Sequence, residues 1–252
     1  MTESKQASTM RSLERAIDVL EVLETAGAPL RLSDIARRAG LHVATTQRIL
    51  GVLETRGRVE EDRSGYRTGV AMLFGAHAYL ASNPVAVAAP LVLQQLAAAT
   101  GLTASVFVRA GNSRAVVARV EGKDPLRYVL PIGQRLPLHL GAGKVLAAHM
   151  DDAEVEQLLD RIGDITHADG RSMTRTEFLA ELATVRAQGW AESTDERVVG
   201  ATSIAAPVVG SDGVCTTAVQ IAGPSTSAMF EDIHAVTIEV RQAATALATR
   251  LG

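Results

Sequence analysis

Cysteine is nearly absent from this 252-residue sequence, which contains only Cys215. One cysteine cannot form an internal disulfide or a cysteine-rich zinc site, and this agrees with a reducing compartment. Long apolar runs are also missing, because none reaches the roughly 18 residues needed to cross a bilayer. The first residues lack the apolar stretch of a signal peptide. These absences predict a cytoplasmic protein with no membrane partner.

Aromatic residues make up only 3% of the chain, so its cores must be built from Ala, Val, Leu and Ile. Hydrophobic residues contribute 47% and charged residues 21%, which is typical of globular proteins. The length exceeds one typical domain of roughly 100 to 200 residues, which favours two domains. Cys215 lies in the apolar run VCTTAVQIA, which favours a small core residue over a reactive thiol.

The net charge of -3 is unusual for a nucleic-acid-binding protein until it is divided along the chain. Residues 1–69 carry 11 Lys and Arg against 10 Asp and Glu, a balance of +1. Within residues 31–69 the balance is 8 against 5, or +3. The positive charge is local and modest, so charge alone does not identify a partner.

Three short helices and a hairpin are predicted near the N-terminus. The first helix is predicted by SLERAIDVLEVLETAGAPL, in which apolar residues recur every three or four positions until Gly27. The second is predicted by LSDIARRAGL, with Ser33 as its cap and Gly40 as its left-handed stop. The third is predicted by HVATTQRILGVLETRG, so the pair forms a helix-turn-helix. A β-hairpin wing is predicted by RVEEDRSGYRTG.

The solvent-facing side of the third predicted helix is the candidate DNA-reading surface. A helix fits the major groove, where Arg48 can donate to guanine edges and Gln47 can pair with adenine edges. Thr45 and Arg63 are expected to bind phosphates or the minor groove. A lone helical hairpin is often only packing, so this prediction depends on the helices and the wing together. The predicted DNA-binding residues are Ser33, Val43, Ala44, Thr45, Gln47, Arg48 and Arg63.

These patterns divide the chain into four segments. Residues 1–10 are predicted to be disordered, 11–69 to form the winged helix-turn-helix, 70–83 to form a linker helix, and 84–252 to form a larger domain. The linker VAMLFGAHAYLASNP is apolar on nearly all sides, which fits a contact between two copies of the chain. A buried connector within one chain is the alternative.

Residues 84–252 mix helices and strands. A helix ending at Gly101 is followed by the predicted strands TASVFVRA, RAVVARVEG and LRYVLPIG. Helices are then predicted around 144–162 and 174–189, strands at IAAPVV and VCTTAVQIAG, and a closing helix over 229–251. This order predicts an α+β domain in which helices flank an antiparallel sheet.

Four motifs in this order make the chain resemble the IclR family of transcription regulators. They are LSDIARRAGLHVATTQRILGVLETRGRVE, YRTG, PLHLGAGKVLAAH and ERVVGATSIAAPVVGSDGVCTTAVQIAGP, and they cover nearly the whole chain. The resemblance implies a winged helix-turn-helix, a dimerising linker helix and a GAF-like effector domain, assembled as a homodimer and usually as a dimer of dimers. It implies double-stranded operator DNA and a small organic acid effector as partners and no cofactor. Members of the family act as repressors or activators, and a repressor is expected here.

The resemblance also places an effector pocket at the loop before GAGK, around GATSIAAP and along VQIAGP. Glycines there expose backbone N–H groups to an anion, and Ser203 and Gln220 add hydrogen bonds. Ala222 stands where some family members have a hydroxyl residue, which favours an aromatic or otherwise bulky acid. The implied residues are Gly141, Ala142, Ser193, Asp195, Ala201, Ser203, Gln220 and Ala222. Ordinary turn or core packing would also explain each of them.

A phosphate-binding loop is not supported by GAGKV. Leu138 stands where that motif requires a glycine, and Val145 replaces its Ser or Thr. The three histidines His139, His149 and His167 lack metal-ligand spacing. We therefore predict neither a metal nor a cofactor.

No nucleophile is paired with a base in the sequence, and G-x-S-x-G is absent. Asp195 and Glu196 in DERVVG are typical of a solvated turn or of an ion pair with Arg197, so no enzymatic activity is predicted. The alternative hypothesis is a metabolic enzyme or small-molecule-binding protein with a GAF-like domain, whose helical N-terminus does not bind DNA.

Overall fold

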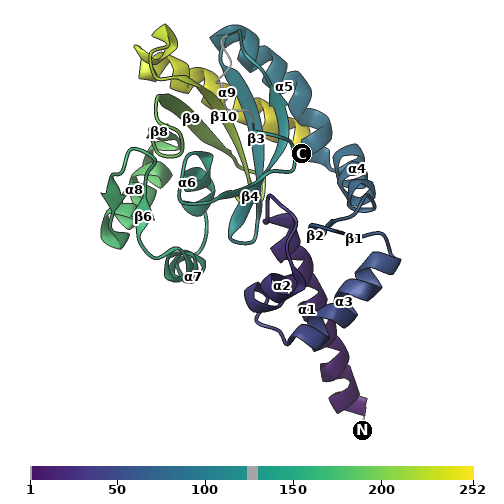
Figure 1. The fold of residues 1–252 in the computed structure, drawn as a ribbon. Coiled ribbons are helices and arrows are strands. Elements are labelled where there is room, and N and C mark those ends of the chain that lie inside the picture. Colours follow the sequence, from purple (N-terminus) through teal and green to yellow (C-terminus); the bar gives the residue numbers. More distant parts are fainter. Residues whose placement is uncertain (1, 124–129) are drawn as a thin grey trace. The chain divides into compact units, whose positions relative to one another are not determined.

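The computed structural model describes residues 2–123 and 130–252, with side chains described from Met10 onward. The chain divides into two compact units, Met1–Tyr79 and Leu80–Gly252. Figure 1 shows the helices and strands of both units with their labels.

The first unit contains the predicted helix-turn-helix and wing. Its elements are α1 (Thr2–Glu24), α2 (Leu32–Arg38), α3 (Val43–Thr55), β1 (Val59–Asp62), β2 (Gly65–Thr68) and α4 (Met72–Ser82), which continues three residues past the unit boundary. β1 and β2 pair antiparallel, with Val59 opposite Thr68. Gly40 has the left-handed φ of 65° that ends α2.

A small apolar core joins these elements. It is formed by Val19, Leu23, Ile35, Leu50, Val59 and Tyr66. Leu13 and Ile17, which belong to the predicted apolar stripe of α1, remain 58% and 48% exposed. The core therefore accounts for only part of the apolar surface of α1.

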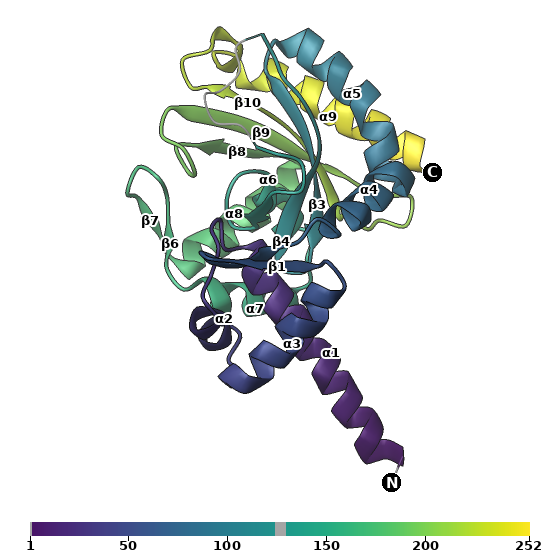
Figure 2. The ribbon, with the colours of Figure 1, turned by 45° about the vertical axis from the view of Figure 1, so that its right-hand side comes forward.

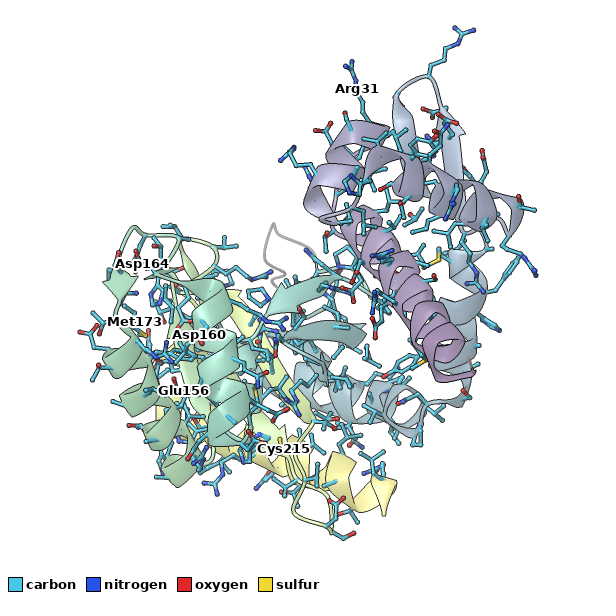
Figure 3. The ribbon with its side chains drawn as sticks, turned by 90° about the horizontal axis from the view of Figure 1, so that it is seen from below. Arg31, Glu156, Asp160, Asp164, Met173 and Cys215 are labelled. Atoms are coloured by element: carbon cyan, nitrogen blue, oxygen red, sulfur yellow. The ribbon has the colours of Figure 1, made fainter. Side chains whose placement is uncertain are left out.

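Two local features differ from the sequence-based expectations. The segment predicted to be disordered, residues 1–10, is helical from Thr2 onward, because no glycine or proline precedes Gly27 to end the helix. Arg31, rather than Ser33, is the residue before the first turn of α2, and it makes no capping hydrogen bond. Figure 3 shows Arg31 extending outward from this turn.

The second unit is an α+β domain, as predicted. Its elements are α5 (Pro84–Thr100), β3 (Thr103–Ala110), β4 (Ser113–Val120), β5 (Arg135–Pro137), α6 (Ala142–Ala147), α7 (Asp152–Ile162), β6 (Ile165–Thr166), β7 (Ser172–Met173), α8 (Arg175–Gln188), β8 (Ala191–Thr194), β9 (Ala201–Val208), β10 (Thr217–Pro224), a 3-10 turn (Ala228–Phe230) and α9 (Ile233–Leu251).

Six strands form one antiparallel sheet in the order β5-β4-β3-β10-β9-β8. α5 and α9 lie side by side on one face, and α6 and α8 lie on the other (Figures 1 and 2). Successive residues of a strand point to opposite faces, so each face has its own core. Val106, Ile204 and Val219 belong to the α5–α9 side, whereas Phe107, Ala205 and Ala218 belong to the α6–α8 side.

A β-bulge interrupts this alternation in β4. Val106 pairs with Ala118 and Phe107 with Val116, so Val117 has no partner in β3. Because of this extra residue, every side chain of β4 after the bulge points to the opposite face of the sheet from the one that simple alternation predicts. Arg119, opposite Ser105, therefore points to the same side of the sheet as Arg114.

Other predicted boundaries shift in the second unit. The strand predicted over 126–133 lies partly outside the described residues, and its described part, from Leu130, is not a strand; β5 begins at Arg135. The helix predicted over 144–162 is broken into α6 and α7, because the side chain of Asp151 caps α7 in a capping box with Glu154. β8 was not predicted.

The start of α8 is tied to α7 by charge. The guanidinium of Arg175 forms ion pairs with Glu156 and, at 2.8 Å, with Asp160. Figure 3 labels these two acidic residues, which both belong to α7. All three side chains are well exposed, so these pairs add little stability.

No single helix in the described ranges, 2–123 and 130–252, is both long and apolar enough to cross a bilayer.

Candidate functional site

The outer face of α3 carries most of the residues predicted to read DNA. Thr46 and Leu50 are buried in the core of the first unit, which leaves Gln47 and Arg48 exposed on the other side of the helix. Val43 and Ala44 are exposed in the first turn, and Thr45 is partly exposed. His42, the residue before the helix, makes no side-chain cap. The first N–H groups of α3 are therefore not engaged by that side chain and can donate to a phosphate.

The wing presents Arg63 at its tip. The Asp62 carboxylate accepts a hydrogen bond of 2.7 Å from the Ser64 backbone and pairs with Arg67 at 2.5 Å. Hydrogen bonds from Ser64, and then the charge of Arg67, hold the pKa of Asp62 below its usual range. Arg67 is thus neutralised within the wing, whereas Arg63 is exposed and forms no ion pair with a described residue.

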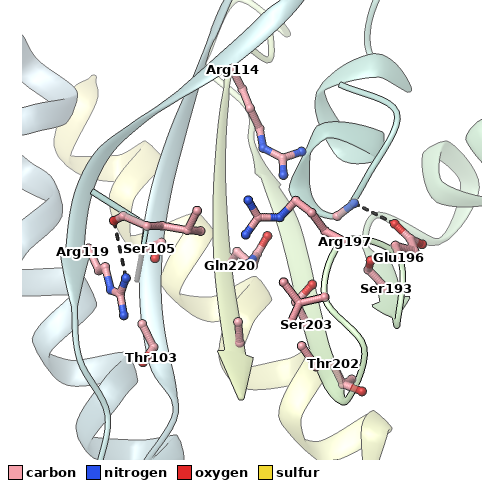
Figure 4. A pocket seen from close by; sticks show the side chains of 15 residues that line it. Thr103, Ser105, Arg114, Arg119, Ser193, Glu196, Arg197, Thr202, Ser203 and Gln220 are labelled. Atoms are coloured by element: carbon pink, nitrogen blue, oxygen red, sulfur yellow. Dashed lines mark hydrogen bonds between the residues drawn. The ribbon is translucent and has the colours of Figure 1, made fainter. Parts of the chain in front are cut away.

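A cavity of about 60 Å³ lies in the second unit, on the α6–α8 side of the sheet (Figure 4). Strand residues line it at alternate positions, as Gln220 and Ala222 do on β10. The loop before α6 and the loop after β8 complete its wall. The lining residues are Thr103, Ser105, Arg114, Arg119, Leu130, Gly141, Ser193, Glu196, Arg197, Val198, Ala201, Thr202, Ser203, Gln220 and Ala222.

Three arginines line this cavity. Arg114 is 2% exposed, lies over the Phe107 ring at 4.9 Å, and donates from Nη1 to the Leu140 carbonyl. The side chain of Arg119 is 8% exposed and donates to the Leu130 carbonyl at 3.4 Å. In both guanidinium groups the buried Nε has no hydrogen-bond partner among the described residues.

Burial, and then the nearby charge of Arg197, lower the pKa of Arg114 to about 9. Arg114 therefore still carries its charge at pH 7, but in surroundings that disfavour it. A bound anion would offset that cost.

A buried ion cluster forms one wall of the cavity. The Lys144 ammonium, 1% exposed, donates to Glu196, to Glu181 at 2.5 Å and to the Glu192 carbonyl at 2.7 Å. The other Glu196 oxygen accepts from the Gly141 backbone at 2.8 Å. Lys144 thus pairs with Glu196, the carboxylate that lines the cavity beside the arginines.

Six of the eight residues predicted for the effector pocket line this cavity, and the other two lie beside it. The backbone N–H of Ala142 donates to the Gln220 side chain at 3.1 Å. Asp195 has a left-handed φ of 61°, and its carboxylate accepts from the Gly200 backbone at 2.6 Å. The six lining residues are Gly141, Ser193, Ala201, Ser203, Gln220 and Ala222; their role in ligand binding stays a prediction.

Comparison with known families decides the class of the protein. The family described as IclR helix-turn-helix domain matches residues 12–63. The family described as bacterial transcriptional regulator IclR C-terminal matches residues 77–249. The chain belongs to the IclR family.

Curated IclR relatives match along almost the whole chain. The HTH-type transcriptional repressor AllR of Escherichia coli is 30% identical over 246 residues, which cover 96% of this chain and 90% of that protein. AllR of Salmonella typhimurium is 31% identical over 252 residues, with the same two shares. The IclR chain is thus similar to repressors throughout both of its units.

Solved IclR structures have the same fold. A putative transcriptional regulator from Rhodococcus sp. RHA1 is 29% identical, with a TM-score of 0.71 over 96% of this chain and 98% of that one. A putative regulator from Silicibacter is 24% identical with a TM-score of 0.83, covering 96% of each chain. An IclR homologue from Microbacterium hydrocarbonoxydans, complexed with 4-hydroxybenzoate, is 23% identical with a TM-score of 0.71, over 95% and 98% of the two chains.

Membership of the IclR family confirms the prediction of a DNA-binding transcription regulator. The alternative, an enzyme or carrier with a non-DNA helical N-terminus, is not favoured by any of these matches. The three cavity arginines of this IclR chain were not predicted from the sequence. Arg114 and Arg119 are five positions apart in a predicted strand, and simple alternation would place them on opposite faces.

Proposed function

We propose that this IclR regulator is a cytoplasmic repressor, and that a small organic anion bound in the cavity of its second unit controls its binding to double-stranded operator DNA. The observation that carries the effector part is the set of three arginines around one small cavity, two of them with an unpartnered buried Nε. A repressor is favoured because the AllR relatives are repressors.

An acid is the ligand class that fits these arginines best. A carboxylate accepts two parallel hydrogen bonds from a guanidinium, and such charge-assisted bonds are roughly twice as strong as neutral ones. The 4-hydroxybenzoate in the Microbacterium homologue is also a carboxylate. The cavity of this chain is more polar than the substitution at Ala222 led us to expect, which weakens the argument for an aromatic effector.

The DNA-binding part is tested by a salt titration. Each phosphate contact releases a counterion, so log K should fall linearly with log salt, with a slope of about -0.9 per contact. The measurement is fluorescence anisotropy of the full-length protein on the promoter upstream of its own gene, between about 50 and 200 mM salt. A salt-independent affinity, or none, would rule out the DNA-binding function.

The effector part is tested by filling the cavity. Ser203→Trp should abolish the response of DNA binding to carboxylates while the thermal unfolding transition is retained, because Ser203 points into the cavity (Figure 4). Ser211→Trp is the matched control, since Ser211 is exposed in a loop away from the cavity lining. A full effector response in the Ser203 variant would place the site elsewhere.

A homodimer, and with it a dimer of dimers, is part of the proposal. α4 buries none of its residues, and Leu73 and Phe74 are 64% and 69% exposed. Met10, Leu13 and Ile17 form a second exposed apolar stripe along α1. Exposed apolar patches of this kind are typical of interaction surfaces. A dimer would also place two DNA-binding units at a fixed spacing, which matches the two half-sites of a palindromic operator.

A further inference from the structure

Arg31 lies at one end of the wing sheet, although it does not belong to the wing hairpin. Resting on the DNA-binding function proposed above, we infer that Arg31 is a second phosphate-binding residue of the wing and binds the DNA backbone together with Arg63. The strand pairing, the backbone geometry and the ion pairs of the wing each support this role.

Leu30 adds a third strand segment to the hairpin. Its backbone N–H donates to the Tyr66 carbonyl at 2.9 Å, and its carbonyl accepts from the Tyr66 N–H at 2.8 Å. In this antiparallel pairing the next residue, Arg31, stands opposite Gly65, the first residue after the wing turn. Neighbouring strands lie about 4.8 Å apart, so the backbone of Arg31 is one strand spacing from the turn that carries Arg63.

Gly65 allows this close approach because it lacks a side chain. Its φ of 131° is one that other residues rarely adopt. A Cβ at this position would lie 2.5 Å from the Leu30 carbonyl oxygen and 3.3 Å from the Arg31 nitrogen. The backbone of Arg31 is therefore held against the wing, whereas its side chain is exposed, extends outward (Figure 3) and makes no capping hydrogen bond to α2.

The charge of Arg31 is not neutralised by the wing. Asp62 is the acidic residue in the same cross-strand row as Arg31, because it pairs with the glycine that stands opposite Arg31. Its carboxylate is already bound by Arg67 at 2.5 Å and by the Ser64 backbone at 2.7 Å. Neither Arg31 nor Arg63 forms an ion pair with a residue that the structure describes. Both guanidinium groups are therefore available to phosphates, with which arginine forms charge-assisted and often bidentate hydrogen bonds.

The place of Arg31 in the helix-turn-helix also favours the DNA backbone over the bases. When the second helix of this motif lies in the major groove, the first helix crosses the backbone. Arg31 immediately precedes that first helix, α2, and it adjoins the hairpin that carries Arg63. Contacts to phosphates fix the position of a protein on DNA without reading its sequence, so Arg31 is expected to strengthen binding to all sequences alike.

The test is a salt titration of Arg31→Ala in the full-length protein. Fluorescence anisotropy on the promoter upstream of its own gene gives the slope of log K against log salt between about 50 and 200 mM. Loss of one phosphate contact should make this slope less steep by about 0.9, so the loss of affinity should be about three to four times greater at 50 mM than at 200 mM. The loss should be the same on an unrelated duplex, and Tm should not change.

Three further variants show whether the charge of Arg31 is responsible. Arg31→Lys keeps the positive charge and should retain the native slope. Arg37→Ala is the matched control, because Arg37 is an exposed arginine of α2 that already pairs with Asp34 at 3.0 Å, and it should change the slope less than Arg31→Ala does. The double variant Arg31→Ala/Arg63→Ala should make the slope less steep by about 1.8, since the two residues bind separate phosphates.

An unchanged slope for Arg31→Ala, or equal changes for Arg31→Ala and Arg37→Ala, would overturn the inference. A loss of affinity confined to the promoter would also overturn it, because Arg31 would then read bases. In each of these cases the native protein would keep its salt-dependent affinity for the promoter. Failure of the proposed DNA-binding function would instead remove that affinity from the native protein, so the two failures are distinguishable.

Discussion

The backbone N–H of Gly141 donates a hydrogen bond of 2.8 Å to the carboxylate of Glu196. An internal carboxylate thus occupies the position at which the resemblance to the family placed the carboxylate of an effector. The neighbouring N–H of Ala142 is likewise taken, by Gln220. In this chain the arginine side chains, rather than these backbone N–H groups, are therefore the groups expected to bind the anion of an effector. Glu196 holds the Gly141 loop in place and is itself bound by Lys144.

Replacing Lys144 with methionine should destabilise the second unit by about 3 to 5 kcal/mol, because Glu196 and Glu181 would remain partly or fully buried without their cation. Urea unfolding followed by circular dichroism measures this loss. Arg175→Met is the matched control: Arg175 also pairs with two carboxylates, but all three side chains are exposed, so the loss should stay below about 1 kcal/mol. Equal losses in the two variants would contradict the role given to burial.

Gly143 allows Arg114 to approach the backbone. A Cβ at position 143 would meet the Leu138 carbonyl oxygen at 2.5 Å and would also collide with Arg114 Nη1. Gly143→Ala should therefore lower Tm and weaken carboxylate binding together. Gly51→Ala, in the exposed middle of α3 with no atom within 4 Å of the new Cβ, should instead stabilise its helix by up to about 1 kcal/mol. If Gly143→Ala changed neither Tm nor carboxylate binding, the close approach of Arg114 to the backbone at position 143 would be disproved.

Cys215 is expected to be unreactive in the native protein. Burial raises the pKa of its thiol to about 11, and the thiolate is the reactive form. At pH 8 a thiol reagent should modify the native protein about a hundredfold more slowly than the protein in urea. The native thiol keeps a proton that the unfolded thiol loses above about pH 9, so stability should fall as pH rises from about 9 toward 11. Rapid labelling of the native protein at pH 8 would disprove this account.

More of the structure could be predicted from the sequence in the first unit than in the second. In the first unit the apolar spacing and Gly40 were enough to predict the helix-turn-helix, because short helices are controlled by local patterns. The N-terminal extension of α1 was missed, because residues 1–10 lack the apolar spacing from which the rest of the helix was predicted.

In the second unit the strands β3 and β4 followed from runs of β-branched residues, but the cavity did not follow from the sequence. Its charge depends on the bulge at Val117, which rotates Arg119 to the side of Arg114. A bulge is fixed by pairing with a distant strand rather than by local residue preferences. The break between α6 and α7 was also missed, although the capping box of Asp151 and Glu154 is a signal that could have located it.

The exposed apolar side chains of α4 lead to a prediction about assembly. Phe74→Glu should shift the protein toward the monomer in analytical ultracentrifugation at low micromolar concentration, because it places a charge in the proposed contact between two copies. Phe74 is 69% exposed in the single chain, so the fold should be unaffected. Ala81→Glu adds the same charge to the same helix without removing a large apolar side chain, and it should change the assembly less. An unchanged sedimentation coefficient for Phe74→Glu would exclude α4 as the dimer contact.

Arg48 and Arg63 should contribute to DNA binding in different ways. Arg48 lies on the exposed face of α3, and Arg48→Ala should cost about 1 to 3 kcal/mol and relax the preference at one base pair. Arg63 lies at the wing tip, and Arg63→Ala should weaken binding to all sequences alike and reduce the salt slope by about 1. Arg67→Ala is the matched control, because Arg67 is already paired with Asp62 and Glu60 and should affect DNA affinity less than Arg63. Anisotropy titrations on the promoter and on single-base variants of it separate the two effects. If Arg48→Ala changed only the salt slope and left base preference intact, α3 would contact the backbone, and the choice of recognition residue would be wrong.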